Sequence, residues 1–219
     1  MECNPKPQIC ARQYNSNAEN TDKSLLPRPM LSEGEILSAA SMGQTVSCSA
    51  LLAEQGHDVI GLEFSELATK SFFEEQHLNY TVSPVETIQG ASVFKADDCQ
   101  IQIYCCDFFA FTSAIAGQFD AVWDRHAFGA MLPKRRTQYS QNLMSLMKPD
   151  GNCLMMTAQY DATVMQGPPF NVRTELIQEF FGDRCDIRKI EQGDAMRDKW
   201  RAKGHKWFEW VLHHLSCKQ

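Results

Sequence analysis

The sequence has little of what marks several common protein classes. It has no C-x-x-C pair, and its nine cysteines are scattered and odd in number, so neither a zinc site nor a dense secreted disulfide framework is expected. No run reaches the ~18 apolar residues of a membrane span, and residues 1–20 lack the apolar core of a signal sequence. A positive charge excess is also missing, because 21 Lys and Arg against 27 Asp and Glu give a net charge of −6. These absences predict a cytoplasmic protein without a metal site and without a membrane or nucleic-acid partner.

The length of 219 residues sets the scale of the protein. One domain per ~100 to 200 residues leaves room for a single hydrophobic core, so one functional site is expected. Residues 1–24 are polar, rich in Asn and without hydrophobic period, which predicts a disordered tail. We therefore expect residues 25–219 to form one domain, which acts as a monomer on a small molecule.

Helical and strand-like segments alternate from about Ala50 onward. The expected helices carry apolar residues at helical spacing and cover residues 49–56, 65–78, 133–147 and 172–182. The expected strands are apolar runs at residues 57–64, 100–109, 119–125 and 152–160, followed by two strand-like runs at 185–192 and 206–215. This order predicts an α/β protein with a doubly wound, mostly parallel sheet and a C-terminal antiparallel hairpin.

Acidic residues stand at the ends of three of these strands. Glu63 follows DVIGL, Asp107 follows IYCC, and Asp124 follows AVW. Ligands of doubly wound sheets bind beyond the carboxyl ends of the strands, where a carboxylate can accept both hydroxyl groups of a ribose. Each acid taken singly is better explained as a cap of the following helix, but the three together favour an adenosine site.

Five segments resemble thiopurine S-methyltransferase and its relatives in order and spacing. They are GHDVIGLEFSE, YCCDFF, FDAVWDRHAF, YDATVMQGPPFNV and GDAMRDKWRAKG, and they run from about Ala50 to about Leu215. WDR followed by GPPF is a specific pair. The resemblance implies the Rossmann-like, seven-stranded sheet of class I S-adenosylmethionine-dependent methyltransferases. It also implies transfer of the methyl group of S-adenosylmethionine to the sulfur of an aromatic or heterocyclic thiol.

The resemblance assigns cofactor-binding roles to individual residues. Glu63 matches the carboxylate that binds the ribose, and Asp107 with Phe108 matches the pair beside the adenine. Gly43 stands nearest to the loop that approaches the cofactor. We expect these residues to bind S-adenosylmethionine.

Other matching residues fall on the reacting side of the site. Arg125 and Asp124 belong to the WDR motif, Phe170 follows two prolines as a residue near the acceptor pocket does, and Lys199 falls closest to a basic substrate-side residue. Methyl transfer to a thiolate needs alignment and cationic groups rather than a strong base. We therefore expect Arg125 and Asp124 to be catalytic, with Arg125 also on the cofactor, and Phe170, Lys199 and Arg201 to bind substrate. A solvated basic turn is the competing interpretation of Lys199 and Arg201.

Residues 30–50 depart from the pattern of the family. Only Ile36 and Leu37 precede a run of small polar residues, and Gly43 is the glycine of the loop that follows. Loss of a central first strand would leave unpaired strand edges and no cofactor loop. The alternative function is therefore a catalytically silent relative, acting as a binding or scaffold protein, or an altered splice form. A third hypothesis keeps the enzyme but directs the methyl group to an oxygen, nitrogen or selenium acceptor.

Overall fold

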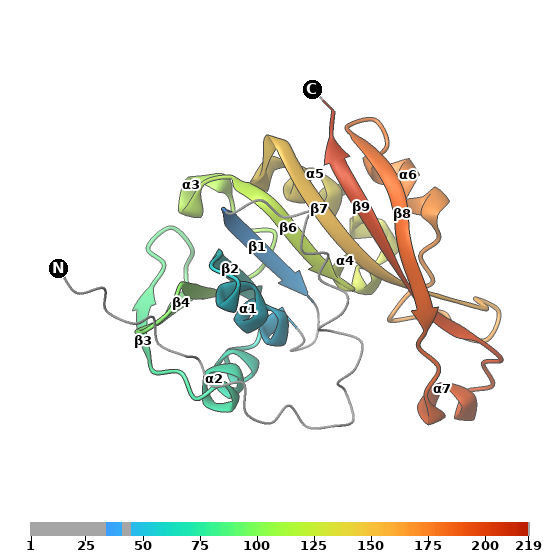
Figure 1. The fold of residues 1–219 in the computed structure, drawn as a ribbon, viewed down its shortest axis with the longest axis horizontal. Coiled ribbons are helices and arrows are strands. Elements are labelled where there is room, and N and C mark those ends of the chain that lie inside the picture. The colour runs from blue at the N-terminus through green and yellow to red at the C-terminus, as the bar shows by residue number, and fades with distance from the viewer. Residues whose placement is uncertain (1–33, 41–44, 219) are drawn as a thin grey trace.

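The computed structural model describes residues 34–40 and 45–218, so the expected tail at residues 1–24 and the loop residue Gly43 lie outside the described residues. Within them, nine strands form one sheet in the order β3-β4-β5-β2-β1-β6-β7-β9-β8 (Figure 1). The strands are β1 Glu35–Ala40, β2 Asp58–Glu63, β3 Tyr80–Pro84, β4 Ser92–Ala96, β5 Ile101–Cys105, β6 Phe119–Arg125, β7 Met147–Tyr160, β8 Cys185–Asp194 and β9 Phe208–Cys217.

The sheet is mixed rather than mostly parallel. Strands β5, β2, β1, β6 and β7 are parallel, and an antiparallel pair extends the sheet at each edge. The pair β8–β9 is the predicted C-terminal hairpin. The expectation of seven strands is wrong, because the β3–β4 hairpin adds two more at the β5 edge. Strand β3 is almost wholly exposed and ends at Pro84, so it shows neither the apolar run nor the alternation that identifies a strand in sequence.

Strand β1, which the sequence left in question, forms at the centre of the sheet. It pairs in parallel with both β2 and β6. Ile36 and Leu37 are fully buried and belong to two different hydrophobic clusters. Successive side chains of a strand point to opposite faces, so one apolar residue anchors each face and a longer apolar run is unnecessary.

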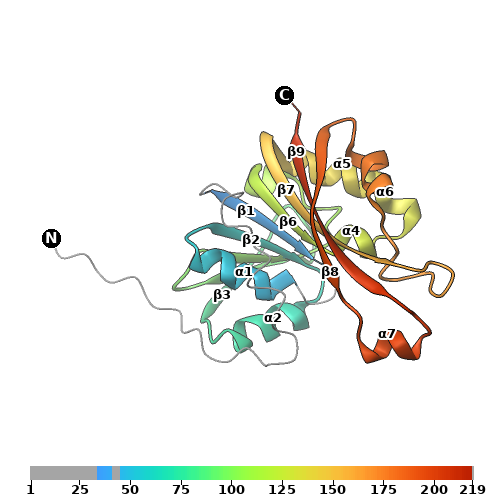
Figure 2. The same cartoon turned by 45° about the vertical axis from the view of Figure 1, so that its right-hand side comes forward.

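Helices cover both faces of the sheet (Figure 2). Helices α1 and α2 pack on one face, where Leu52 and Phe73 are fully buried, and helices α4, α5 and α6 pack on the other, around Phe128 and Leu143. The helices are α1 Thr45–Glu54, α2 Glu66–Glu75, α3 Ser113–Ala116, α4 Ala127–Ala130, the 3₁₀ turn η1 Pro133–Arg135, α5 Arg136–Leu146, α6 Thr174–Phe181 and α7 Asp198–Ala202. None of the described helices has the length and apolar character needed to cross a membrane.

Helix α7 lies in the connection from β8 to β9 and was missed in sequence, where this stretch looked merely polar. It is fixed by a stack of rings in which Trp200 lies 4.4 Å from Phe208, and Phe208 lies 5.0 Å from Tyr160. Tyr160 and Phe208 are register partners at the carboxyl end of β7. The stack therefore places α7 near the carboxyl ends of the parallel strands, where the acidic strand ends also lie.

Candidate cofactor and substrate site

Glu63 ends β2 and is only 7% exposed. Its Oε1 accepts hydrogen bonds from the backbone amides of Phe64 and Ser65, both at 2.9 Å. Its Oε2 is buried and has no hydrogen-bond partner among the described residues. An unmet buried carboxylate oxygen is costly in a folded protein, so this atom is set to accept hydrogen bonds from a ligand.

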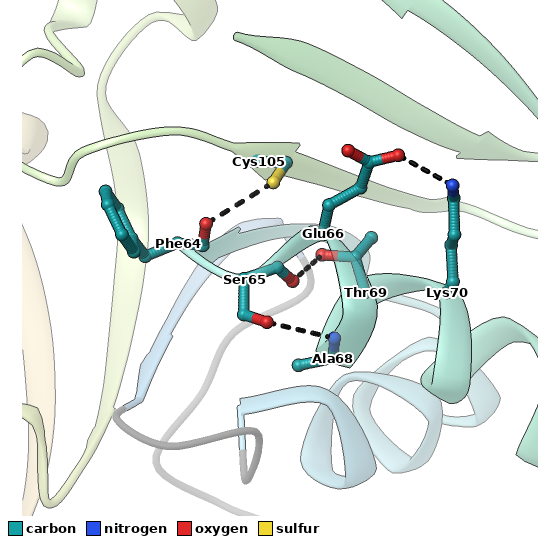
Figure 3. Close-up of polar contacts among 7 residues, drawn as sticks. All are labelled: Phe64, Ser65, Glu66, Ala68, Thr69, Lys70 and Cys105. Carbon is teal, nitrogen blue, oxygen red and sulfur yellow. Dashed lines mark hydrogen bonds and ion pairs between the residues drawn. The ribbon is translucent and has the colours of Figure 1, made fainter.

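The turn that follows Glu63 is held by a short network (Figure 3). Ser65 caps α2, since its side chain accepts a hydrogen bond from the amide of Ala68 at 3.3 Å, and Thr69 donates to the Ser65 carbonyl at 3.2 Å. The thiol of Cys105, on β5, donates to the carbonyl of Phe64 at 3.6 Å. These contacts cap helix α2 and fix the backbone on which Glu63 sits.

Two large apolar side chains stand beside this turn. Phe64 is 79% exposed and Leu67 is 76% exposed. In Figure 3 the ring of Phe64 points away from helix α2. Together they give the region around Glu63 an apolar surface, which suits the flat face of a nucleobase.

Asp107 and Phe108 follow β5 at the same edge. Asp107 is exposed, and its Oδ1 accepts a hydrogen bond from the amide of Phe109 at 2.9 Å. The ring of Phe108 stacks on Tyr139 of α5 at 4.6 Å, and Asn142 donates to its carbonyl at 2.7 Å. The loop is therefore anchored to α5, while the carboxylate of Asp107 keeps access to solvent.

Asp124 lies near the end of β6 and is fully buried. Its carboxylate accepts hydrogen bonds from the amides of Ala127 at 2.8 Å and Phe128 at 3.2 Å, and from the hydroxyl of Tyr139 at 2.9 Å. Burial raises its pKa to about 7, although these donors oppose the shift. A side chain without exposed atoms does not reach a substrate, so the expectation that Asp124 takes part directly in catalysis does not fit its position.

Arg125 ends β6, one residue beyond Asp124, and is half-buried. His126 follows in the left-handed conformation, with φ of 63°, and its amide donates to the carbonyl of Met156 at 2.9 Å. Burial, together with the charges of Arg125 and Arg197, lowers the pKa of His126 to about 4. The ring is therefore neutral near pH 7, and the charges of two arginines act on it.

Arg197 is a site candidate that the sequence reasoning missed. It precedes α7 directly, and its charge acts on His126, which follows β6. The stack that fixes α7 thus brings this arginine toward the β6 end. Its nearness to Lys199 in the GDAMRDKWRAKG segment was the available signal.

Phe170 is held next to helix α4. Its amide donates to the carbonyl of Gly129 at 2.7 Å, and the guanidinium of Arg136 lies 5.3 Å from its ring. The ring also lies against Gly167, where a Cβ atom would stand 2.4 Å from the ring and where φ is 92°. Glycine at position 167 lets the Phe170 ring lie against this backbone, and the Phe170 amide holds the GPPF motif on the helix that begins after Arg125 and His126.

Lys199 and Arg201 lie on α7, at the same edge but engaged locally. The Lys199 ammonium sits 4.6 Å from the Trp200 ring centre, and Arg201 pairs with Asp198 at 2.9 Å. Arg201 also lines a cavity of ≈440 Å³ with His205 and Trp207, among others. The structure thus places both cations on α7, each engaged with a residue of that helix.

The chain is similar in sequence to known proteins. A sequence model of the thiopurine S-methyltransferase family matches residues 42–216. The chain is 42% identical over 167 residues to a probable thiopurine S-methyltransferase of Danio rerio, covering 76% of this chain and 72% of that protein. It is 37% identical to thiopurine S-methyltransferase of Rattus norvegicus, covering 76% and 69%.

A solved structure shares the fold at low identity. The 1,6-didemethyltoxoflavin-N1-methyltransferase of Burkholderia thailandensis, with bound 1,6-didemethyltoxoflavin and S-adenosylhomocysteine, superposes with a TM-score of 0.57 at 13% identity. The match covers 90% of this chain and 76% of the other. At this identity the likeness concerns the α/β architecture alone.

Proposed function

The chain belongs to the thiopurine S-methyltransferase family, and on that basis we propose that it transfers the methyl group of S-adenosylmethionine to the sulfur of an aromatic or heterocyclic thiol. The structural observation that carries the proposal is the buried Oε2 of Glu63, which has no hydrogen-bond partner among the described residues. A carboxylate oxygen in this state fits the donor groups of a ribose. S-adenosylmethionine, when bound, supplies the methyl group on a sulfonium sulfur.

Cofactor binding would rest on two strand ends, those of β2 and β5, and on the apolar surface next to them. Glu63 would accept hydrogen bonds from the ribose hydroxyls, and the exposed carboxylate of Asp107 would face the adenine. Phe64 would cover one face of the base. Phe108 would act by holding this loop on Tyr139 rather than through its own ring face.

Recognition of an anionic acceptor would fall to the arginines at the β6 end. An aromatic thiol is largely thiolate near neutral pH, so the chain needs to align it and to balance its charge, and a strong base is unnecessary. The charges of Arg125 and Arg197 both act on His126, which follows β6 directly. His126, with its low pKa, is a weak base and is assigned no proton transfer.

Asp124 would serve as a positioning residue. It binds the first amides of α4 and the Tyr139 hydroxyl, and so fixes the backbone that carries Arg125. Phe170, pressed on α4 beside Gly129, would form the apolar wall of the acceptor pocket. Lys199 and Arg201 would form a cationic rim on the α7 side.

The alternative of a catalytically silent relative rested on a missing first strand and on a cofactor loop unable to bind. Strand β1 is present between β2 and β6, which removes the first of these two grounds. The cofactor loop around Gly43 lies outside the described residues. A monomeric, cytoplasmic enzyme without a nucleic-acid partner is part of the same proposal. The hypothesis of an acceptor other than sulfur is tested by comparing methyl transfer to an aromatic thiol with methyl transfer to the matching phenol and aniline.

The test uses Arg125→Met, which keeps the stem and removes the charge. With an aromatic thiol, we expect kcat/KM to fall on the order of 100-fold, the usual effect of losing one donor to a developing or resident anion. The melting temperature should stay within a few degrees. Arg188→Met, an exposed arginine of β8, is the matched control and should leave both quantities unchanged. Unchanged activity in Arg125→Met with a much lower melting temperature would make Arg125 structural and refute its assignment.

A further inference from the structure

Two cysteines face each other at the end of the β8–β9 pair that lies away from the site. Cys185 begins β8 and Cys217 ends β9, and they are direct register partners in an antiparallel pair. The amide of Lys218 donates to the carbonyl of Arg184 at 2.9 Å, so the neighbouring pair is the hydrogen-bonded one. Bonded and non-bonded pairs alternate, so Cys185 and Cys217 form a non-hydrogen-bonded pair, in which the Cα atoms are ~4.5 Å apart and the side chains lie closest.

The two side chains share one environment. Both belong to the hydrophobic cluster under α5, where the thiol of Cys185 donates to the sulfur of Met144 at 3.6 Å. Cys185 is 1% exposed, whereas Cys217 is half-buried. Burial and then Cys217 raise the pKa of Cys185 to about 12, so the two thiols are near enough to affect one another.

We propose that Cys185 and Cys217 are an oxidation site at which a hydroperoxide forms a reversible cross-strand disulfide. The expected Cα separation falls within the ~4.4 to 6.8 Å range of protein disulfides, so the bond requires rotation about the side-chain torsions rather than a shift of strands. Elsewhere in the described part of the chain, no strand register pairs one cysteine with another.

The chemistry proceeds in two balanced steps. The thiolate of Cys217, the more exposed sulfur, attacks an oxygen of hydrogen peroxide and forms a sulfenic acid, while the other oxygen leaves as water after taking up a proton. The sulfur of Cys185 then displaces the sulfenic hydroxyl, which leaves as water with the Cys185 proton. Two thiols and one peroxide give one disulfide and two waters. Because burial disfavours both thiolates, the reaction should be slow, over hours rather than seconds.

The position of the pair predicts the consequence of the bond. Cys217 lies at the opposite end of β9 from Phe208, which at ~3.3 Å per residue is roughly 30 Å from the edge that carries the site. The disulfide should therefore leave methyl transfer unchanged. It should raise stability, because it closes the 185–217 loop and restricts the unfolded chain.

The experiment oxidises the full-length protein with excess hydrogen peroxide for several hours, alkylates the remaining thiols and maps tryptic peptides without reduction. Trypsin releases Cys185 in the 185–188 peptide and Cys217 in the 207–218 peptide, neither of which holds another cysteine. We expect the two peptides to be joined and then separated by dithiothreitol. The joined protein should melt roughly 5 to 10 °C higher. Cys217→Ser should lose both effects, and Cys99→Ser, a half-buried thiol on no paired strand, should keep both.

Two outcomes would overturn the proposal. In one, the 185–188 and 207–218 peptides stay alkylated while Cys99 is oxidised, which would show that peroxide reaches the protein but not this pair. In the other, Cys217 is joined to a cysteine other than Cys185. Cys185→Ala removes the buried partner and keeps Cys217, so the 207–218 peptide should stay unjoined. If that peptide is joined to another peptide in this variant, the proposal is also overturned.

Discussion

The carboxylates at the ends of β2 and β6 are both buried, with β1 between their strands, yet they meet opposite surroundings. Glu63 has one oxygen bound to the turn amides and one without a partner among the described residues. Asp124 has both oxygens bound, to two amides of α4 and to Tyr139. The two acids therefore have different roles.

The difference follows from which element supplies the donors. Among the described residues, Glu63 accepts hydrogen bonds only from the two that follow it in sequence, so one oxygen stays available to a ligand. Asp124 also receives the hydroxyl of Tyr139 from α5, fifteen residues onward in sequence. A carboxylate saturated by the protein fixes architecture, whereas one left half-satisfied provides a binding group.

Removing Asp124, the carboxylate with both oxygens hydrogen-bonded, should lower the free energy of unfolding the most. Asp124→Ala leaves a hydroxyl and two amides without their acceptor in the interior, each at ~1 to 3 kcal/mol. At pH 5 we expect the free energy of unfolding to fall by about 5 kcal/mol, as measured by urea denaturation. Glu63→Ala, which strands only amides at a turn, is the comparison and should lose much less. Equal losses in the two variants would erase the distinction between the two acids.

A second prediction uses the pKa of Asp124, which burial raises from 3.8 to about 7. The folded state then holds the proton more tightly than the unfolded state, so this carboxyl's contribution is complete below pH ~4 and is lost as the pH rises through 7. Asp124→Asn resembles the protonated form and does not titrate. Relative to the parent, the variant should gain stability between pH 4 and 8, by up to about 4 kcal/mol. A difference that is constant with pH would contradict the raised pKa.

Removing a single donor to Asp124 should lower the free energy of unfolding the least. Tyr139→Phe removes the hydroxyl that binds Asp124 and keeps the ring that stacks on Phe108. A loss of about 1 kcal/mol in the free energy of unfolding at pH 5 is expected, the usual value of one hydrogen bond. Thermal melts of Tyr139→Phe, Asp124→Ala and the double variant would measure it. If Tyr139→Phe costs as much as Asp124→Ala, the α4 amides contribute nothing.

Local signals were enough to predict much of the fold. The alternation of helices and strands, the helix that follows Glu63 and the helix after Pro133 all depend on residues close in sequence, and the structure has them. Strand β3, which is exposed along almost its whole length, carries no such signal. Strand β1 is short in apolar residues because each face of the sheet needs only one of them.

The site was harder to predict than the fold. Glu63 and Asp124 look alike in sequence, since each is an acid after an apolar strand, and what separates them is a tyrosine on a distant helix. The charge of Arg197 acts on His126 although the two residues are far apart in sequence, and a ring stack holds α7, which follows Arg197, against the end of β9. Such long-range pairings cannot be worked out from the spacing of residues in one sequence.

The most direct test of the account is a calorimetric titration with S-adenosylhomocysteine of the parent protein, Glu63→Gln and Glu66→Gln. The glutamine at position 63 replaces the free acceptor oxygen with an amide nitrogen, at a cost of ~1 to 3 kcal/mol in binding. Glu66 is exposed, pairs with Lys70 and serves as the control in the next turn. We expect measurable binding to the parent, unchanged binding to Glu66→Gln and about 10- to 100-fold weaker binding to Glu63→Gln. Equal affinity in all three proteins would contradict this expectation.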